Sequence, residues 1–261
     1  MRVDTSELPK DNWHHFLRLR DLTQVLREVP VDPKWRVLEI GAGDGVQTAS
    51  LRKVFSFVQP IDIAPSAQVE GLIIADVSNL PFDNNEFDLI FSSNVLEHVE
   101  DIDKGLRELK RVLAPNGMMI HSMPTSVWKT IQVLGRPFAS LIRAIRMLIP
   151  GFSQTQKRPR AGTHGSLHGS DLSRRSLLQR VIGLAVPNIH GTSGNHVSEF
   201  LRFRPAWWLR KFESSGLNCV RTTPLFLHSP YDSFPYKFIS VREHLSRMGF
   251  ASVRAYWLRI P

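Results

Sequence analysis

The feature that most constrains the fold of this chain is a regular alternation of short apolar runs and amphipathic segments between residues 36 and 124. Segments 46–55 and 101–114 have helical spacing, and the second ends at Pro115-Asn116-Gly117. Because strands that alternate with helices form right-handed crossovers, the pattern predicts a mostly parallel, doubly wound α/β sheet. The expected strands are 36–40, 57–63, 72–75, 87–93 and 118–123, preceded by a helix over 11–29.

Glycines and acidic side chains gather where these strands end. The first strand contains Glu39 and leads into Gly41-Ala42-Gly43-Asp44-Gly45, a turn that lets a ligand approach the backbone beside the next helix. Asp62 ends the second strand, where a carboxylate can accept hydrogen bonds from both hydroxyls of a ribose. Asp76 follows the third strand and can accept one from an adenine amino group. This set predicts a site for a nucleoside that carries a cationic group.

Four segments together resemble the class I S-adenosylmethionine-dependent methyltransferases. They are VLEIGAGDG (37–45), PIDIAPS (60–66), ADVSNLPFDNNEFDLIFSSNVLEHVED (75–101) and LRELKRVLAPNGMMIHSMP (106–124). More narrowly, they are similar to the type 11 subgroup of small-molecule and quinone-biosynthesis-like enzymes. The resemblance implies a Rossmann-like doubly wound seven-stranded sheet, with the last strand antiparallel and a helical insertion after strand 5. A final helix over 204–215 and strands over 217–223 and 251–260 would complete that sheet.

The resemblance also implies S-adenosyl-L-methionine as cofactor and assigns its contacts. Glu39, Gly41, Ala42 and Gly43 would surround the methionine part, and Asp62 with Ile63 would border the ribose. Asp76 and Val77 would border the adenine, and Asn94 and Val95 would line the methyl-transfer face. His98 is a catalytic candidate, with a structural role in tethering its loop as the alternative.

Three other classes of site fit the sequence poorly. A nicotinamide dehydrogenase fingerprint needs a third glycine three positions after the second, but position 46 is Val46. The fourth strand is followed by Asn94-Val95-Leu96 rather than by the Asn/Asp-Pro-Pro-Tyr run of methyltransferases that modify DNA base amino groups. A single cysteine, Cys219, rules out an intrachain disulfide and argues against a cysteine-based zinc site.

The two halves of the chain differ strongly in charge. Residues 1–124 hold 13 basic and 19 acidic side chains, whereas residues 125–261 hold 20 and 5. The basic half predicts an acidic partner: a phosphorylated or other acidic small-molecule or lipid-linked substrate, an anionic membrane surface or nucleic acid. Solvated arginines on a soluble face are the alternative. A small molecule, sugar or lipid-linked intermediate, methylated on oxygen, is the favoured substrate. A nucleic-acid-directed methyltransferase is the alternative, although the sequence contains no dedicated nucleic-acid-binding module.

The sequence is interpreted as a single domain over 1–261, with a core of 11–124 and 204–261 and a substrate-recognition insertion over 125–203. Residues 136–149 form a basic amphipathic segment that could be a lid on the domain or lie in a membrane interface. No run of apolar residues is long enough for a spanning helix. The expected location is therefore the cytoplasm, with peripheral contact at the inner membrane surface left open.

Histidines gather in the second half of the chain. His164 and His168 lie in a polar segment over 156–175, while His190 and His196 flank the sequence GTSGN. We expect His190, Glu199 and Arg202 to contact substrate, with His196 as a second catalytic candidate. A structural role for these histidines is the alternative. No metal is expected, because their spacing matches no established zinc pattern.

Overall fold

The computed structural model describes residues 12–148, 189–192, 194–229 and 237–261. The chain divides into two compact units. The first comprises residues 1–129, 189–228 and 234–261, and it contains the whole sheet. The second comprises 130–188 and 229–233. The unit boundaries thus fall at 129/130 and 188/189, whereas the sequence analysis places the ends of the insertion at 125 and 203.

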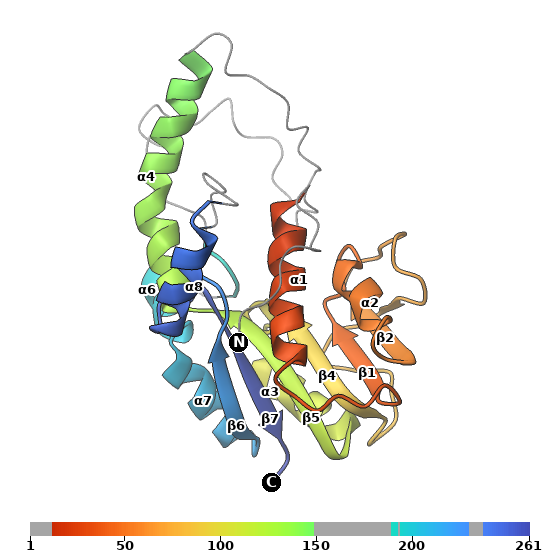
Figure 1. Cartoon of the computed structure of the whole chain (residues 1–261). Coiled ribbons are helices and arrows are strands. Elements are labelled where there is room, and N and C mark those ends of the chain that lie inside the picture. The colour runs from red at the N-terminus through yellow and green to blue at the C-terminus, as the bar shows by residue number, and fades with distance from the viewer. Residues whose placement is uncertain (1–11, 149–188, 193, 230–236) are drawn as a thin grey trace, which may run out of the picture. The chain divides into compact units, whose positions relative to one another are not determined.

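The first unit is built on a seven-stranded sheet of order β3-β2-β1-β4-β5-β7-β6 (Figure 1). Strands β1 to β5 are parallel, and β7 runs antiparallel to both β5 and β6. Their bounds are β1 Arg36–Ile40, β2 Phe57–Asp62, β3 Ile73–Ile74, β4 Phe87–Ser93, β5 Leu113–Pro124, β6 Asn218–Pro224 and β7 Val253–Arg259. The predicted Rossmann-like doubly wound fold is confirmed.

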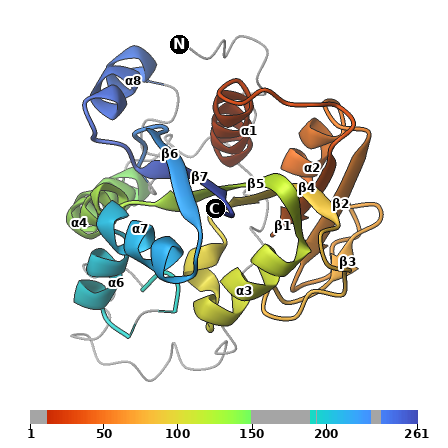
Figure 2. The same cartoon turned by 90° about the horizontal axis from the view of Figure 1, so that it is seen from below.

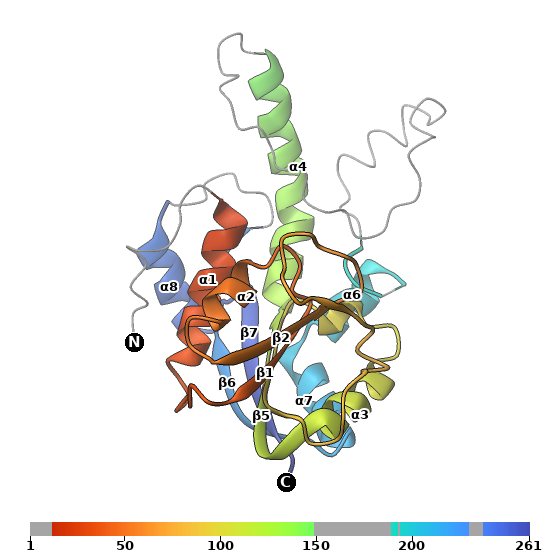
Figure 3. The same ribbon diagram turned by 90° about the vertical axis from the view of Figure 1, so that its right-hand side faces the viewer.

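Helices cover both faces of this sheet (Figures 2 and 3). On one face α1 and α2 pack against alternate strand residues such as Val37 and Phe91, and α8 lies beyond α1. On the other face α3 and α7 pack against Leu38 and Met119. The helices are α1 Trp13–Leu26, α2 Val46–Leu51, the short 3-10 helix η1 Leu96–His98, α3 Ile102–Val112, α4 Ser126–Leu148, α6 His196–Arg202, α7 Pro205–Ser214 and α8 Ile239–Arg247.

Side-chain caps begin three of these helices where the sequence has short polar residues. The Asn12 side chain accepts hydrogen bonds from the first backbone N–H groups of α1, and Asp101 accepts one from Lys104 at the start of α3. Asn195 and Ser198 form a reciprocal capping box at α6. Each cap satisfies a backbone donor that has no partner within the helix. These residues therefore fix where the three helices begin.

Several element boundaries differ from those predicted. Helix α3 ends at Val112 rather than 114, because β5 already begins at Leu113, where it pairs with Phe87. Strand β3 has two residues instead of four, since only Ile73 and Ile74 pair with β2. Helix α8 lies in segment 224–250, for which the sequence predicted no element. Helix α8 has few apolar residues, so its sequence shows little of the hydrophobic periodicity that predicts a helix.

A buried charged group joins α1 to α8. The Arg20 guanidinium donates to Asp21 at 3.0 Å and to Glu243 of α8 at 3.3 Å, and it lies 4.3 Å from the centroid of the Phe226 ring. All three charged side chains are buried. Burial raises the pKa of Asp21 to about 6, although Arg20 acts against this shift. Because two carboxylates share one guanidinium, Arg20 determines how α8 is held on α1.

Helix α4 contains the amphipathic segment predicted over 136–149. The backbone is helical to Leu148 with Pro137 inside it, so the predicted helical insertion after strand 5 is confirmed. The side chains of Phe138 and residues 141–149, on which the choice between lid and membrane helix depends, lie outside the described residues, as does the polar segment 156–175. Within the described part of the chain, no helix is long and apolar enough to cross a membrane.

Candidate functional site

The glycine turn after β1 closes tightly beneath the loop that follows β4. Gly41 has a φ of +74°, and a Cβ atom at this position would lie 2.3 Å from Cγ2 of Val95. The N–H groups of Gly41 and Ala42 both donate to the carbonyl of Ile61 in β2, which fixes the start of the turn. Only glycine combines this backbone conformation with such a close approach. The turn is therefore held in contact with the end of β4.

Asp62 ties the end of β2 to the same turn. One carboxylate oxygen accepts the N–H of Gly43 at 2.9 Å, and the other accepts the N–H of Ala64 at 3.2 Å. A carboxylate oxygen can accept more than one hydrogen bond. Asp62 thus retains acceptor capacity for two further donors, as the hydroxyls of a ribose would require. The neighbouring predicted residue, Ile63, is two-thirds exposed.

Glu39 lies in the interior of β1, below the turn. Its side chain is almost fully buried, and burial raises its pKa to about 7 although the nearby Thr48 hydroxyl, Arg52 and Arg18 act against this shift. Among the described residues, its Oε2 atom has no hydrogen-bond partner. A buried carboxylate in this state is stabilised by any additional positive charge. This observation fits the cationic methionine part of S-adenosylmethionine.

Helix α1 contributes two side chains to the glycine turn. His15 Nε2 lies 2.9 Å from one oxygen of Asp44, and Arg18 donates to the other at 3.2 Å. Although partial burial opposes the shift, Arg18 and His15 hold the pKa of Asp44 below its usual range. The sequence analysis missed both residues, because a contact between segments 26 to 29 residues apart leaves no local pattern.

The two residues predicted to border an adenine have different environments. Asp76 is exposed, and the N–H of Ser78 donates to its carboxylate at 2.7 Å. This hydrogen bond lowers the pKa of Asp76. Val77 is buried against Gly105 of α3 and belongs to the core. Asp76 therefore remains accessible to a ligand beyond β3, while Val77 anchors its loop.

The loop after β4 has a constrained start. Asn94 has a φ of +54°, and its N–H donates to the carbonyl of Ser122 in β5 at 2.8 Å. Asn tolerates this left-handed conformation better than most residues, and such conformations concentrate at functional loops. The bend turns Val95 onto Gly41 and leads directly into η1.

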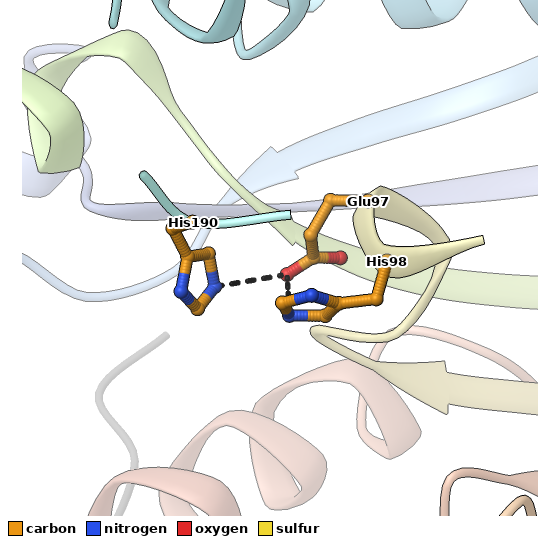
Figure 4. Close-up of side chains that lie close together, drawn as sticks. All are labelled: Glu97, His98 and His190. Carbon is orange, nitrogen blue, oxygen red and sulfur yellow. Dashed lines mark ion pairs between the residues drawn. The ribbon is translucent and has the colours of Figure 1, made fainter. Parts of the chain in front are cut away.

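Glu97, His98 and His190 come together beside this loop (Figure 4). Oε1 of Glu97 lies 3.9 Å from Nε2 of His98 and 3.8 Å from Nε2 of His190. The two imidazole rings are in edge contact, with centroids 4.5 Å apart, and Trp128 packs against His190. Glu97 is a functional candidate that the sequence analysis missed. It was read only as part of the family motif.

The remaining predicted residues form a separate group around Glu199. This carboxylate is fully buried, pairs with the equally buried Lys129, and accepts the N–H of His190 at 2.7 Å. Nδ1 of His196 lies 3.9 Å from its other oxygen. Arg202 donates to Thr192 at 3.0 Å and lies over the Trp207 ring. The structure therefore brings His98 and His190 together but places His196 and Arg202 outside that cluster.

Comparisons with known proteins agree with this geometry. Residues 38–121 match the family model described as a methyltransferase domain. The chain is 34% identical over 112 residues to malonyl-[acyl-carrier protein] O-methyltransferase of Halorhodospira halophila, covering 38% of each chain. It is also 34% identical over 99 residues to demethylmenaquinone methyltransferase of Corynebacterium urealyticum, covering 36% of this chain and 43% of that one. The matches thus span well under half the length of these relatives.

The solved structures extend the likeness to the whole fold. A methyltransferase from Aquifex aeolicus, described as dependent on S-adenosylmethionine, superimposes with a TM-score of 0.51 over 100% of both chains, at 13% identity. At this identity the likeness concerns the fold alone. Residues 38–121 are therefore similar to a methyltransferase domain, and the first unit of the chain has the seven-stranded fold that this structure shares.

Proposed function

We propose that the protein transfers a methyl group from S-adenosylmethionine to an oxygen of a small-molecule or lipid-linked acceptor. The observation that carries the proposal is the hydrogen bond from the glycine turn to Asp62, together with the buried carboxylate of Glu39, whose Oε2 atom has no hydrogen-bond partner among the described residues. Neutral interior packing does not require such a carboxylate, whereas a ligand with a ribose and a cationic end uses both groups.

The cofactor would be held by residues from three strand ends. S-adenosylmethionine, when bound, supplies a methyl group already activated on a sulfonium. Glu39 and the turn Gly41-Ala42-Gly43 hold the charged methionine end, and Asp62 with Ile63 holds the ribose. Asp76 and Val77 border the adenine, and Asn94 with Val95 lines the face at which transfer takes place. Because the methyl donor is activated, the main tasks of the protein are alignment and exclusion of water.

The acceptor would lie next to the cluster of Glu97, His98 and His190. The family match ends at residue 121, and the two relatives are named for different acceptors. Acceptor choice is therefore expected to depend on residues beyond 121, and among these His190 places its Nε2 atom 3.8 Å from the carboxylate of Glu97. His196 and Glu199 instead hold the loop that positions His190.

Calorimetric titration with S-adenosylmethionine and S-adenosylhomocysteine tests the cofactor site. Both should bind saturably, with NADH giving no heat, and Asp62→Asn should weaken both at least tenfold. Asp88→Asn is the matched control, because Asp88 also accepts a backbone N–H, from Arg36 at 2.8 Å, but at the opposite end of β1. Failure of a folded protein to bind either nucleoside would overturn the proposal. Release of S-adenosylhomocysteine with hydroxylated acceptors then tests transfer itself.

A further inference from the structure

We propose that Glu97, His98 and His190 form a binding site for one divalent transition-metal ion, such as Zn²⁺. Each residue offers one ligand atom, and the three atoms lie within 4.8 Å of one another. They come from η1 and from a loop more than 90 residues later in the chain, so no sequence spacing reveals them. The proposal does not depend on methyl transfer, although it places a cation beside the proposed acceptor position.

The state of the Glu97 carboxylate is the strongest argument for a cation. Its side chain is 1% exposed, and neither oxygen has a hydrogen-bond partner among the described residues. An ionised carboxylate buried in this way is costly unless it is paired or bound to a metal. Both imidazoles point their Nε2 atoms at the same oxygen (Figure 4).

Glu199 provides an internal comparison. It is equally buried and lies only a few residues from His190, but Lys129 supplies its counter-charge. In the described parts of the chain, Glu97 forms no ion pair with a lysine or an arginine. The fold thus neutralises one of two neighbouring buried carboxylates with an ammonium group and surrounds the other with imidazoles.

The ligand types and their exposure suit an open metal site. Two imidazoles and one carboxylate are ligands that Zn²⁺ and related ions accept, at bond lengths of about 2.0–2.2 Å. Two ligand atoms at such distances are roughly 3–4 Å apart, close to the 3.8 and 3.9 Å separations between Glu97 Oε1 and the imidazole nitrogens. The side chains of His98 and His190 are 45% and 35% exposed, so further positions face outward. These open coordination positions could be filled by an oxygen atom, such as the hydroxyl group of an acceptor.

The loop that carries His190 contacts the backbone of η1. Gly191 has a φ of +84°, and a Cβ atom there would lie 2.6 Å from the carbonyl oxygen of Glu97. The N–H of Thr192 donates to that same oxygen at 3.3 Å. The positions of Glu97 and His190 are therefore set by backbone contacts as well as by their side chains, as metal sites require.

The test is titration of ZnCl₂ and CoCl₂ into protein stripped with a chelator, followed by calorimetry and by the visible absorption of Co²⁺. We expect one saturable site per chain, weakened at least tenfold in Glu97→Gln and in His190→Ala. His244→Ala is the matched control and should bind like the unmodified protein, because His244 is an exposed histidine of α8 that does not belong to this cluster.

Circular dichroism and titration with S-adenosylhomocysteine establish that each variant is folded and keeps its cofactor site. If Glu97→Gln does not fold, His98→Asn and His190→Asn carry the test. Absence of a saturable metal site, or a site that survives these substitutions, overturns the metal proposal. Because S-adenosylhomocysteine binding is measured on the same samples, loss of the metal site and loss of the cofactor site are distinguishable.

Discussion

The backbone N–H of His190 donates a hydrogen bond to Glu199, the carboxylate that pairs with buried Lys129. One oxygen of Glu199 thus positions the residue that faces Glu97, while the other pairs with the ammonium group. Lys129 lies in α4, the helix that follows β5, and Glu199 lies in α6, after the inserted segment. The ion pair therefore links the two ends of the inserted segment, next to the position at which we expect the acceptor to bind.

Glu199→Gln should lower the free energy of unfolding by about 3–5 kcal/mol, because it removes the charge of the buried carboxylate that pairs with the buried ammonium group of Lys129. The double variant Lys129→Met/Glu199→Gln should recover most of this loss. Urea denaturation of the two single variants and the double variant measures the coupling between the two residues. Additive losses would show that the two groups do not act as a pair.

Gly41→Ala should weaken S-adenosylhomocysteine binding at least tenfold, because the added Cβ would displace Val95 and distort the turn. Gly43→Ala is the matched control. Gly43 lies in the same turn and also has a positive φ, of +57°, but a Cβ there meets no atom closer than 3.7 Å. Calorimetry on both variants separates the collision from backbone strain alone. Equal losses in the two variants would contradict the packing explanation.

Glu39 should make stability fall as pH rises from about 4.5 to above 7. Its folded-state pKa of about 7 exceeds the ordinary value of 4.5, so the folded chain retains a proton that the unfolded chain loses in this range. The difference corresponds to about 3 kcal/mol. Thermal or urea unfolding across this range should show the decline in the unmodified protein and a smaller one in Glu39→Gln.

Cofactor binding should also depend on this residue. A cationic ligand next to Glu39 favours the ionised form, so affinity for S-adenosylmethionine should rise with pH up to about 7. The slope should disappear in Glu39→Gln, whose affinity should be lower at all pH values. A pH-independent affinity in the unmodified protein would place the cationic end of the ligand elsewhere.

Arg20→Met should destabilise the protein by about 3–5 kcal/mol, because the buried carboxylates of Asp21 and Glu243 would lose the guanidinium with which both of them pair. Arg247→Met is the control. Arg247 also pairs with Glu243, at 3.8 Å, but its side chain is 56% exposed, and exposed pairs contribute about 0–1 kcal/mol. Urea unfolding compares the two. Similar effects would show that Arg20 is not the group that holds α8.

The sheet was more predictable from the sequence than the site. Strands β1 and β4 have the predicted bounds, because buried parallel strands appear as continuous apolar runs that end at glycine or polar residues. Asp62 and Asp76 could be identified because they directly follow such apolar runs. The assignment of Glu39 to the cofactor remains a prediction, supported by its burial and raised pKa.

The contacts of His190 and His196 could not be predicted from the sequence in this way. His190 and His196 were grouped because they are close in sequence, but the left-handed turn at Gly191 and the cap at Asn195 point them to different carboxylates. The pairing of Glu97 with His190, like that of Lys129 with Glu199, links distant segments. Neither pairing leaves a periodic signal in the sequence.

The position of β7 has a consequence for how the protein folds. It lies between β5 and β6, although it follows both in the chain, and β6 pairs in the sheet with β7. During synthesis β6 therefore cannot form its hydrogen bonds to the sheet until residues 253–259, which form β7, have left the ribosome. Nascent chains stalled before this point would expose the apolar face of α7, which includes Trp208 and Phe212, and should be substrates for chaperones.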